Sequence, residues 1–168
     1  MTAYAVLLRA VNVGKNNRVA MADLRTLLEG LGHGEVATVL NSGNAVFTSD
    51  RSTGLAAEVE AGLRGLGVSV GAAVVTCDDL MAMVEQLPAR VAATAYPLVG
   101  VLLGPPTGEP ADFAPDVWEL GPGCVWLGYA TDVHTSRMTT PRLEKGLGTG
   151  VTARTPATLL RLLAARRS

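Results

Sequence analysis

The chain has 168 residues, of which 48% are hydrophobic and 17% charged, and its formal net charge is −1. This composition indicates a well-packed globular protein and excludes a largely disordered chain, while a net charge near zero excludes broad electrostatic binding to DNA or to an anionic membrane. No apolar run reaches the roughly 18 residues that a membrane helix needs, and the start lacks the pattern of a secretory signal. We therefore expect a cytoplasmic protein with no membrane association.

The first elements are marked by a change of hydrophobic period. Residues 3–9 form a short apolar run that predicts a buried strand. Leucines at helical spacing over 21–31 predict a helix, and Gly32 is the kind of residue that ends one. His33 lies between Gly32 and Gly34, so we expect it in a turn at the surface.

A hairpin, a second helix and a fourth strand complete the first half. The extended segments 36–40 and 45–48 flank the polar turn 41–44 and predict the hairpin. A helix is expected over 52–66, capped by the hydroxyl of Ser52 or Thr53, followed by a strand over 68–76. Strand, helix, hairpin, helix, strand is the order of the ferredoxin-like split β-α-β motif.

The second half combines further helices and strands. We expect a helix over 78–87, capped by Asp78 or Asp79, and then a strand over 96–103. A loop over 104–110 leads to a hairpin formed by 118–120 and 124–129. A further helix is expected from Ser136 to Leu147, although Pro141 can delay its start. Thr155 and Pro156 predict the cap and first residue of a terminal helix. The sequence thus predicts an α+β fold, with a ferredoxin-like module over 1–76 and a second α+β half over 77–168 that either shares its core or forms its own domain.

Polar and cationic residues gather in the loop after the first strand. Arg9, Asn12, Gly14, Lys15 and Arg18 lie within this one segment. Backbone amides of a glycine-containing loop, together with Arg and Lys charges, can bind a phosphate. Because the loop has one glycine, it matches neither the P-loop nor the dinucleotide fingerprint. The segment predicts an anion-binding site, with a solvated turn as the competing interpretation.

The turn over 41–44 offers a second polar group. Ser42, Gly43 and Asn44 supply a hydroxyl, exposed backbone and an amide. Turn geometry alone explains such residues at a hairpin tip. If the turn and the loop after the first strand lie at the same edge of the sheet, they form one site.

Other reactive side chains are better explained by structure. Asp132, His134 and Ser136 are too close in sequence to favour a catalytic triad, whose members converge in space. Cys77 and Cys124 lack paired spacing and are expected to be buried free thiols. We expect no metal site and no cofactor.

Three classes of function remain open. The first is a binding module for an anionic small molecule or nucleotide, and the second is an enzyme that uses the same polar loops but lacks an evident general base or nucleophile. The third is an interaction protein, with self-association through a sheet edge or the terminal helix. Nucleic-acid binding is disfavoured, because only 4% of the residues are aromatic. The predicted strands offer Tyr4 and Phe47 with few basic residues between them, and Phe47 is more simply a core residue.

Several motifs resemble those of a bacterial family. The segment Leu7–Gly14 and the turn Asn41–Asn44 resemble the signature of the family known as domain of unknown function 1697, and Thr152–Thr155 is similar to its C-terminal signature. That family usually has Asn and Trp where Thr155 and Pro156 occur here. The resemblance implies the following matched site residues: Arg9, Asn12, Gly14, Ser42, Gly43, Asn44 and Arg154. It implies a fold but no activity, because the family's biochemical role is unsettled.

Overall fold

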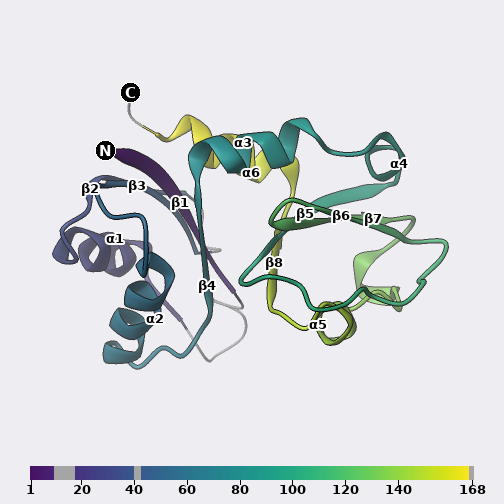
Figure 1. The fold of residues 1–168 in the computed structure, drawn as a ribbon, viewed down its shortest axis with the longest axis horizontal. Coiled ribbons are helices and arrows are strands. Elements are labelled where there is room, and N and C mark those ends of the chain that lie inside the picture. The colour runs from purple at the N-terminus through teal and green to yellow at the C-terminus, as the bar shows by residue number, and fades with distance from the viewer. Residues whose placement is uncertain (10–17, 40–42, 167–168) are drawn as a thin grey trace. The chain divides into compact units, whose positions relative to one another are not determined.

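The computed structural model describes residues 1–9, 18–39 and 43–166, which form the helices and antiparallel sheets of an α+β protein, as the sequence predicts (Figure 1). The chain divides into two compact units. Unit 1 contains residues 1–81 and the chain from Leu159 onward, and unit 2 contains residues 82–158. Within the part of the chain that is described, every helix is too short or too polar to cross a bilayer.

Unit 1 is built on a four-stranded sheet in the order β2-β3-β1-β4, with every neighbouring pair antiparallel. Its strands and first two helices are β1 (Thr2–Leu8), α1 (Met21–Gly30), β2 (Gly34–Val39), β3 (Asn44–Ser49), α2 (Leu55–Gly65) and β4 (Ala72–Thr76). This element order agrees with the order predicted from the sequence. The helix that follows β4 is α3 (Cys77–Glu85).

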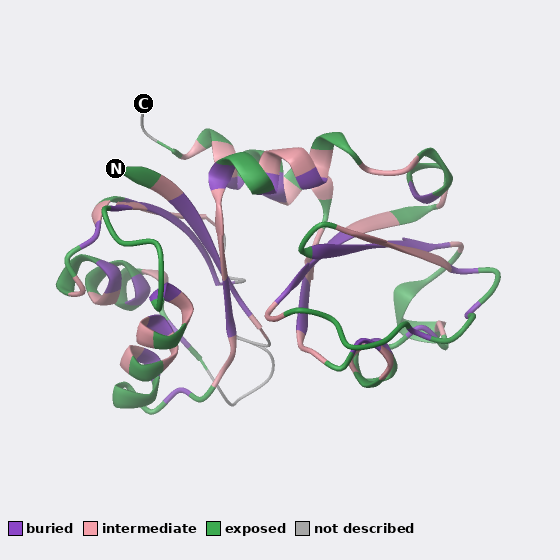
Figure 2. Ribbon diagram, viewed as in Figure 1, coloured by how far each residue is buried: buried purple, intermediate pink, exposed green. Residues whose placement is uncertain are grey.

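The central strand β1 of unit 1 is buried on both faces of the sheet. Tyr4, Val6 and Leu8 of β1 belong to the core cluster that α1 and α2 share with the sheet. Side chains alternate along a strand, so Ala5 and Leu7 point to the opposite face, and they too have no exposed surface. Figure 2 shows β1 coloured as buried along most of its length. A strand buried on both faces explains why this segment is continuously apolar rather than alternating.

Two predicted helix caps in unit 1 are wrong. The N-cap of α2 is Gly54, whose φ of 73° is left-handed, and neither Ser52 nor Thr53 supplies a side-chain cap. In α3 the Oγ1 atom of Thr76 accepts a hydrogen bond of 3.0 Å from the N–H of Asp79. The capping hydroxyl therefore lies before the helix, and the two carboxylates predicted to cap it fall inside its first turn.

Unit 2 contains a second antiparallel sheet, in the order β6-β7-β5-β8. Its elements are α4 (Ala89–Ala92), β5 (Tyr96–Leu102), β6 (Val117–Gly121), β7 (Cys124–Tyr129), the 3-10 turn η1 (Val133–Thr135), α5 (Thr140–Leu147) and β8 (Val151–Arg154). The short elements α4 and β8 are not predicted from the sequence. The last helix, α6 (Pro156–Ala164), crosses the boundary between the units.

In the second half of the chain, α5 and α6 each begin directly after a threonine whose hydroxyl caps the helix. The helix expected from Ser136 begins only at Thr140, where the side chain of Thr139 accepts the N–H of Arg142 and Pro141 occupies the first turn. The predicted cap of α6 is confirmed, since Thr155 Oγ1 accepts the N–H of Thr158 at 3.1 Å. Proline in the first turn costs nothing, because the amides there have no partner within the helix.

Candidate functional site

The end of β1 and the start of β3 lie at the same edge of the unit 1 sheet. Leu7 pairs with Asn44, and the N–H of Leu8 donates to the carbonyl of Gly43 at 2.8 Å. On the other side, the N–H of Arg9 donates to the carbonyl of Gly71 at 2.9 Å. We call Arg9, Gly43, Asn44 and Gly71 the loop edge. The condition for one shared site, that the two polar segments leave the sheet at one edge, is met by their described ends.

Gly43 and Asn44 have structural roles at this edge. The φ of Gly43 is 79°, a left-handed value that favours glycine. Asn44 has no exposed surface, and its Nδ2 donates to the carbonyl of Val39 at 3.2 Å, which ties the end of β2 to the start of β3. Gly43 thus has a conformation that other residues rarely adopt, and the Asn44 amide is used within the hairpin.

A carboxylate is held next to the loop edge. Glu60 of α2 accepts the N–H of Ala72 through Oε1 at 2.9 Å. The carbonyl of Gly71, which accepts from the N–H of Arg9, belongs to the same peptide unit as the N–H of Ala72. Arg9 is partly buried, while Arg18, on the far side of the loop, is exposed. The described ends of the loop therefore carry two guanidinium groups. The Glu60 carboxylate is anchored on the outer side of β4, because the C=O of Gly71 and the N–H of Ala72 point in opposite directions across their trans peptide.

The remaining predicted site residues are distributed differently. Asn12, Gly14, Lys15 and Ser42 lie outside the described residues. Arg154 belongs to unit 2, at the end of β8. Its Nη1 donates to Thr152 Oγ1 at 2.7 Å and to the carbonyl of Ala153 at 2.9 Å, and burial lowers the pKa of its guanidinium to about 10.

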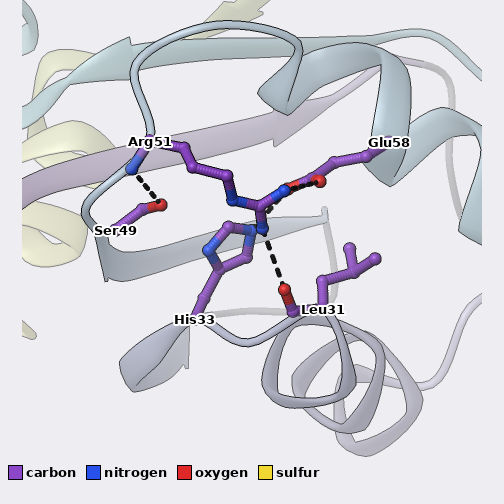
Figure 3. A network of polar contacts seen from close by, with 5 residues as sticks. All are labelled: Leu31, His33, Ser49, Arg51 and Glu58. Carbon is purple, nitrogen blue, oxygen red and sulfur yellow. Dashed lines mark hydrogen bonds and ion pairs between the residues drawn. The ribbon is translucent and has the colours of Figure 1, made fainter.

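His33, expected at the surface, is buried, so that prediction is wrong. Its side chain has no exposed surface, and its Nε2 lies 2.7 Å from Glu58 Oε1 (Figure 3). The ring packs on Phe47 with a centroid separation of 4.4 Å. The flanking glycines allow the chain to turn, and the imidazole then folds inward over the core. The sequence carries no signal for this contact, since Glu58 is remote along the chain.

The carboxylate of Glu58 also binds Arg51. Arg51 Nη1 lies 2.6 Å from Glu58 Oε2, and its Nη2 donates to the carbonyl of Leu31 at 2.9 Å (Figure 3). The loop that bears Arg51 is thereby tied to α2 and to the end of α1. Because His33 is fully enclosed, its imidazole cannot reach a substrate, and we interpret the network as structural.

The residues of the disfavoured triad do not act together. Asp132 Oδ1 accepts the backbone N–H of His134 at 2.8 Å, which is a local turn contact. Ser136 donates its hydroxyl hydrogen to the Asp116 carboxylate and accepts the N–H of Met138. The hydroxyl of Ser136 is therefore bonded to a carboxylate and not to an imidazole.

Thiol and metal chemistry receive no geometric support. Cys77 and Cys124 are buried free thiols, as predicted. Burial raises the pKa of both, that of Cys124 to about 11, so neither is activated as a thiolate. The described residues contain no group of three or more His, Cys, Asp and Glu side chains placed to hold a metal.

Comparison with known proteins gives a family and a fold. Residues 1–115 match the model of the family described as "Protein of unknown function (DUF1697)". No curated protein matches the chain. The structure of the conserved bacterial protein SP0830 from Streptococcus pneumoniae is similar to this chain, with 24% sequence identity, a TM-score of 0.70, and coverage of 98% of each chain. At this identity the likeness shows the fold alone. The family match covers well over half of the sequence, and the chain therefore belongs to the DUF1697 family.

Proposed function

We propose that unit 1 binds an anionic small molecule or nucleotide at the loop edge. The observation that carries the proposal is the pairing of Leu7 with Asn44, together with the backbone bonds of Leu8 and Arg9, which brings the described ends of the two polar segments to one edge. Arg9 and Arg18 supply charge there, and the carbonyl of Gly43 is held by the N–H of Leu8. A rigid edge lowers the entropy lost when a ligand binds.

The carboxylate of Glu60, on the outer side of β4, reduces the positive potential at this edge by its longer-range field. It is held in place by the N–H of Ala72, so its position does not depend on a ligand. A bound anion would be repelled by it, and its removal should strengthen anion binding. Glutamine at position 60 keeps an oxygen acceptor for the Ala72 N–H while it removes the charge, so E60Q tests the electrostatics without loss of the hydrogen bond.

Thermal unfolding in the presence of nucleotides and phosphorylated metabolites tests the proposal. A ligand at about ten times its Kd should raise Tm by about 4 °C. R9Q should abolish the rise, R18Q should reduce it, and E60Q should increase it at a given ligand concentration.

R64Q is the matched control, because Arg64 is an exposed arginine of α2 and its loss changes the net charge equally. It should leave the rise unchanged. A screen in which no phosphorylated compound shifts Tm, or in which R64Q and R9Q have the same effect, would remove the proposal.

A further inference from the structure

Unit 2 contains a hollow that none of the predicted site residues lines. It has a volume of about 490 Å³ and lies between the loop segment 109–113 and one side of α5. This volume is in the range of pockets that hold small molecules. The prolines and glycines of the loop predict irregular structure, and the contacts with α5 hold this irregular segment in place.

The loop wall is pressed against the helix by close backbone contacts. The N–H of Thr107 donates to the carbonyl of Leu147 at 2.8 Å. A Cβ atom at Gly146 would lie 2.6 Å from Pro110 Cα and 2.9 Å from the carbonyl oxygen of Glu109, so the backbone of the loop reaches the helix where the helix has no side chain. The wall of the hollow is therefore fixed before any ligand arrives.

The lining divides into an apolar part and a charged rim. Pro110 and Phe113 are both buried and contribute the apolar part. Arg142 and Lys145 lie one turn apart on α5, both exposed, and contribute two positive charges. Arg142 is oriented by its Nη1, which donates to the carbonyl of Arg137 at 3.0 Å.

The charged residues that line the hollow form no ion pair with one another in the part of the chain that the structure describes. Glu109 also lines it, yet across residues 1–9, 18–39 and 43–166 neither Glu109 nor Lys145 has a side-chain hydrogen bond or an ion pair. Three charged side chains thus face the same space and leave an excess of one positive charge. The Lys145 ammonium and the Glu109 carboxylate are available to a ligand, and Arg142 offers the guanidinium hydrogens that the Arg137 carbonyl does not accept.

We propose that this hollow binds a small organic anion with an apolar body. The apolar body packs on Pro110 and Phe113, and the carboxylate or phosphate group is held by Lys145 and Arg142. Inorganic phosphate alone would not make the apolar contacts, and a neutral aromatic compound would not make the charged contacts. Glu109 opposes a second negative charge and favours a ligand that carries a hydroxyl or amino donor on its body.

Calorimetric titration of the whole chain with phenyl phosphate tests the inference, with inorganic phosphate and benzyl alcohol as the two partial ligands. Phenyl phosphate should bind saturably and at least about tenfold more tightly than either. K145Q and R142Q should each weaken its binding about fivefold, and E109Q should strengthen it about threefold, as expected for charged contacts at an exposed rim.

R161Q, which removes an exposed arginine from α6, is the control and should leave the affinity unchanged. R9Q should also leave it unchanged, which separates this hollow from the loop edge. The inference is overturned if inorganic phosphate binds as tightly as phenyl phosphate, if K145Q and R161Q behave alike, or if no saturable binding is found. Equal losses in R9Q and K145Q would likewise contradict it.

Discussion

The imidazole Nε2 of His33 lies 2.7 Å from a carboxylate oxygen of Glu58, and no part of the His33 side chain is exposed. The carboxylate accepts the Nε2 hydrogen. The other ring nitrogen, Nδ1, is buried without a hydrogen-bond partner among the described residues. Among the described residues, Glu58 is therefore the hydrogen-bond partner of the imidazole. The stability of unit 1 should depend strongly on this pair.

E58A should destabilise the protein by about 2–3 kcal/mol, because it leaves a buried donor unsatisfied. R51A removes the other partner of Glu58, but the Arg51 side chain is half exposed, so its loss should cost about 1 kcal/mol or less. Urea unfolding followed by far-UV circular dichroism measures both. Equal costs for the two variants would show that the buried imidazole is not what Glu58 stabilises.

Replacement by alanine should have opposite effects on the stability of the protein at two glycines near the end of α2. A Cβ atom added at Gly65 or at Gly67 would meet no atom within 4 Å, so space does not distinguish the two positions. Gly65 is the last helical residue, and G65A should stabilise by about 0.5–1 kcal/mol. Gly67 has φ of 81°, and G67A should destabilise by about 1 kcal/mol. Midpoints of urea unfolding would decide, and shifts of the same sign would contradict this assignment.

Burial of Cys124 should make stability fall at alkaline pH. Its pKa rises from 9.0 to about 11 in the folded chain, so the unfolded chain releases this proton first. The stabilisation is complete below pH 9 and is lost as pH rises through 11, with a slope of about 1.4 kcal/mol per pH unit between them. C124A removes this slope at the cost of a small cavity. The stability difference between wild type and C124A should therefore shrink from about pH 8.5 to pH 11, and a constant difference would refute the shift.

Gly121 should tolerate no side chain. A Cβ atom there would lie 2.4 Å from Cη2 of Trp126, whose ring is held by a 2.9 Å bond from Nε1 to the carbonyl of Met83. G121A should therefore cost at least about 2 kcal/mol through overpacking. Trp126 is buried, so its fluorescence during urea unfolding reports the loss. G30A, at a helical glycine with open space around it, is the control and should not destabilise.

The fold is predictable from sequence where local pattern and tertiary packing agree. The leucine spacing of α1 and the hydroxyl and proline at the start of α6 mark these helices within one residue or two. The four residues of β8 carry no such pattern, because a strand this short is defined by its pairing with β5. The cap of α2 is not predictable from its hydroxyl residues, because a left-handed glycine takes their place.

The candidate site is predictable from sequence only in part, because tertiary contacts, and not local pattern alone, bring its residues together. Arg9 and Gly43 are recognisable as loop residues, but their meeting at one edge depends on the antiparallel pairing of β1 with β3. The role of Glu60 depends on a contact with Ala72, 12 residues away, that no spacing rule gives. His33 shows the converse, since its neighbours in sequence suggest a turn while its burial depends on Phe47 and Glu58.

The most direct test of the loop edge is a crystal structure of the chain soaked with tungstate, an electron-dense phosphate analogue, whose position anomalous scattering locates without reference to any assumed site. We predict a tungstate peak within hydrogen-bonding distance of the Arg9 guanidinium, adjacent to Gly43, that is absent from crystals of R9Q. Tungstate bound elsewhere in unit 1, or a peak at the loop edge that persists in R9Q, would contradict the assignment of anion binding to this edge.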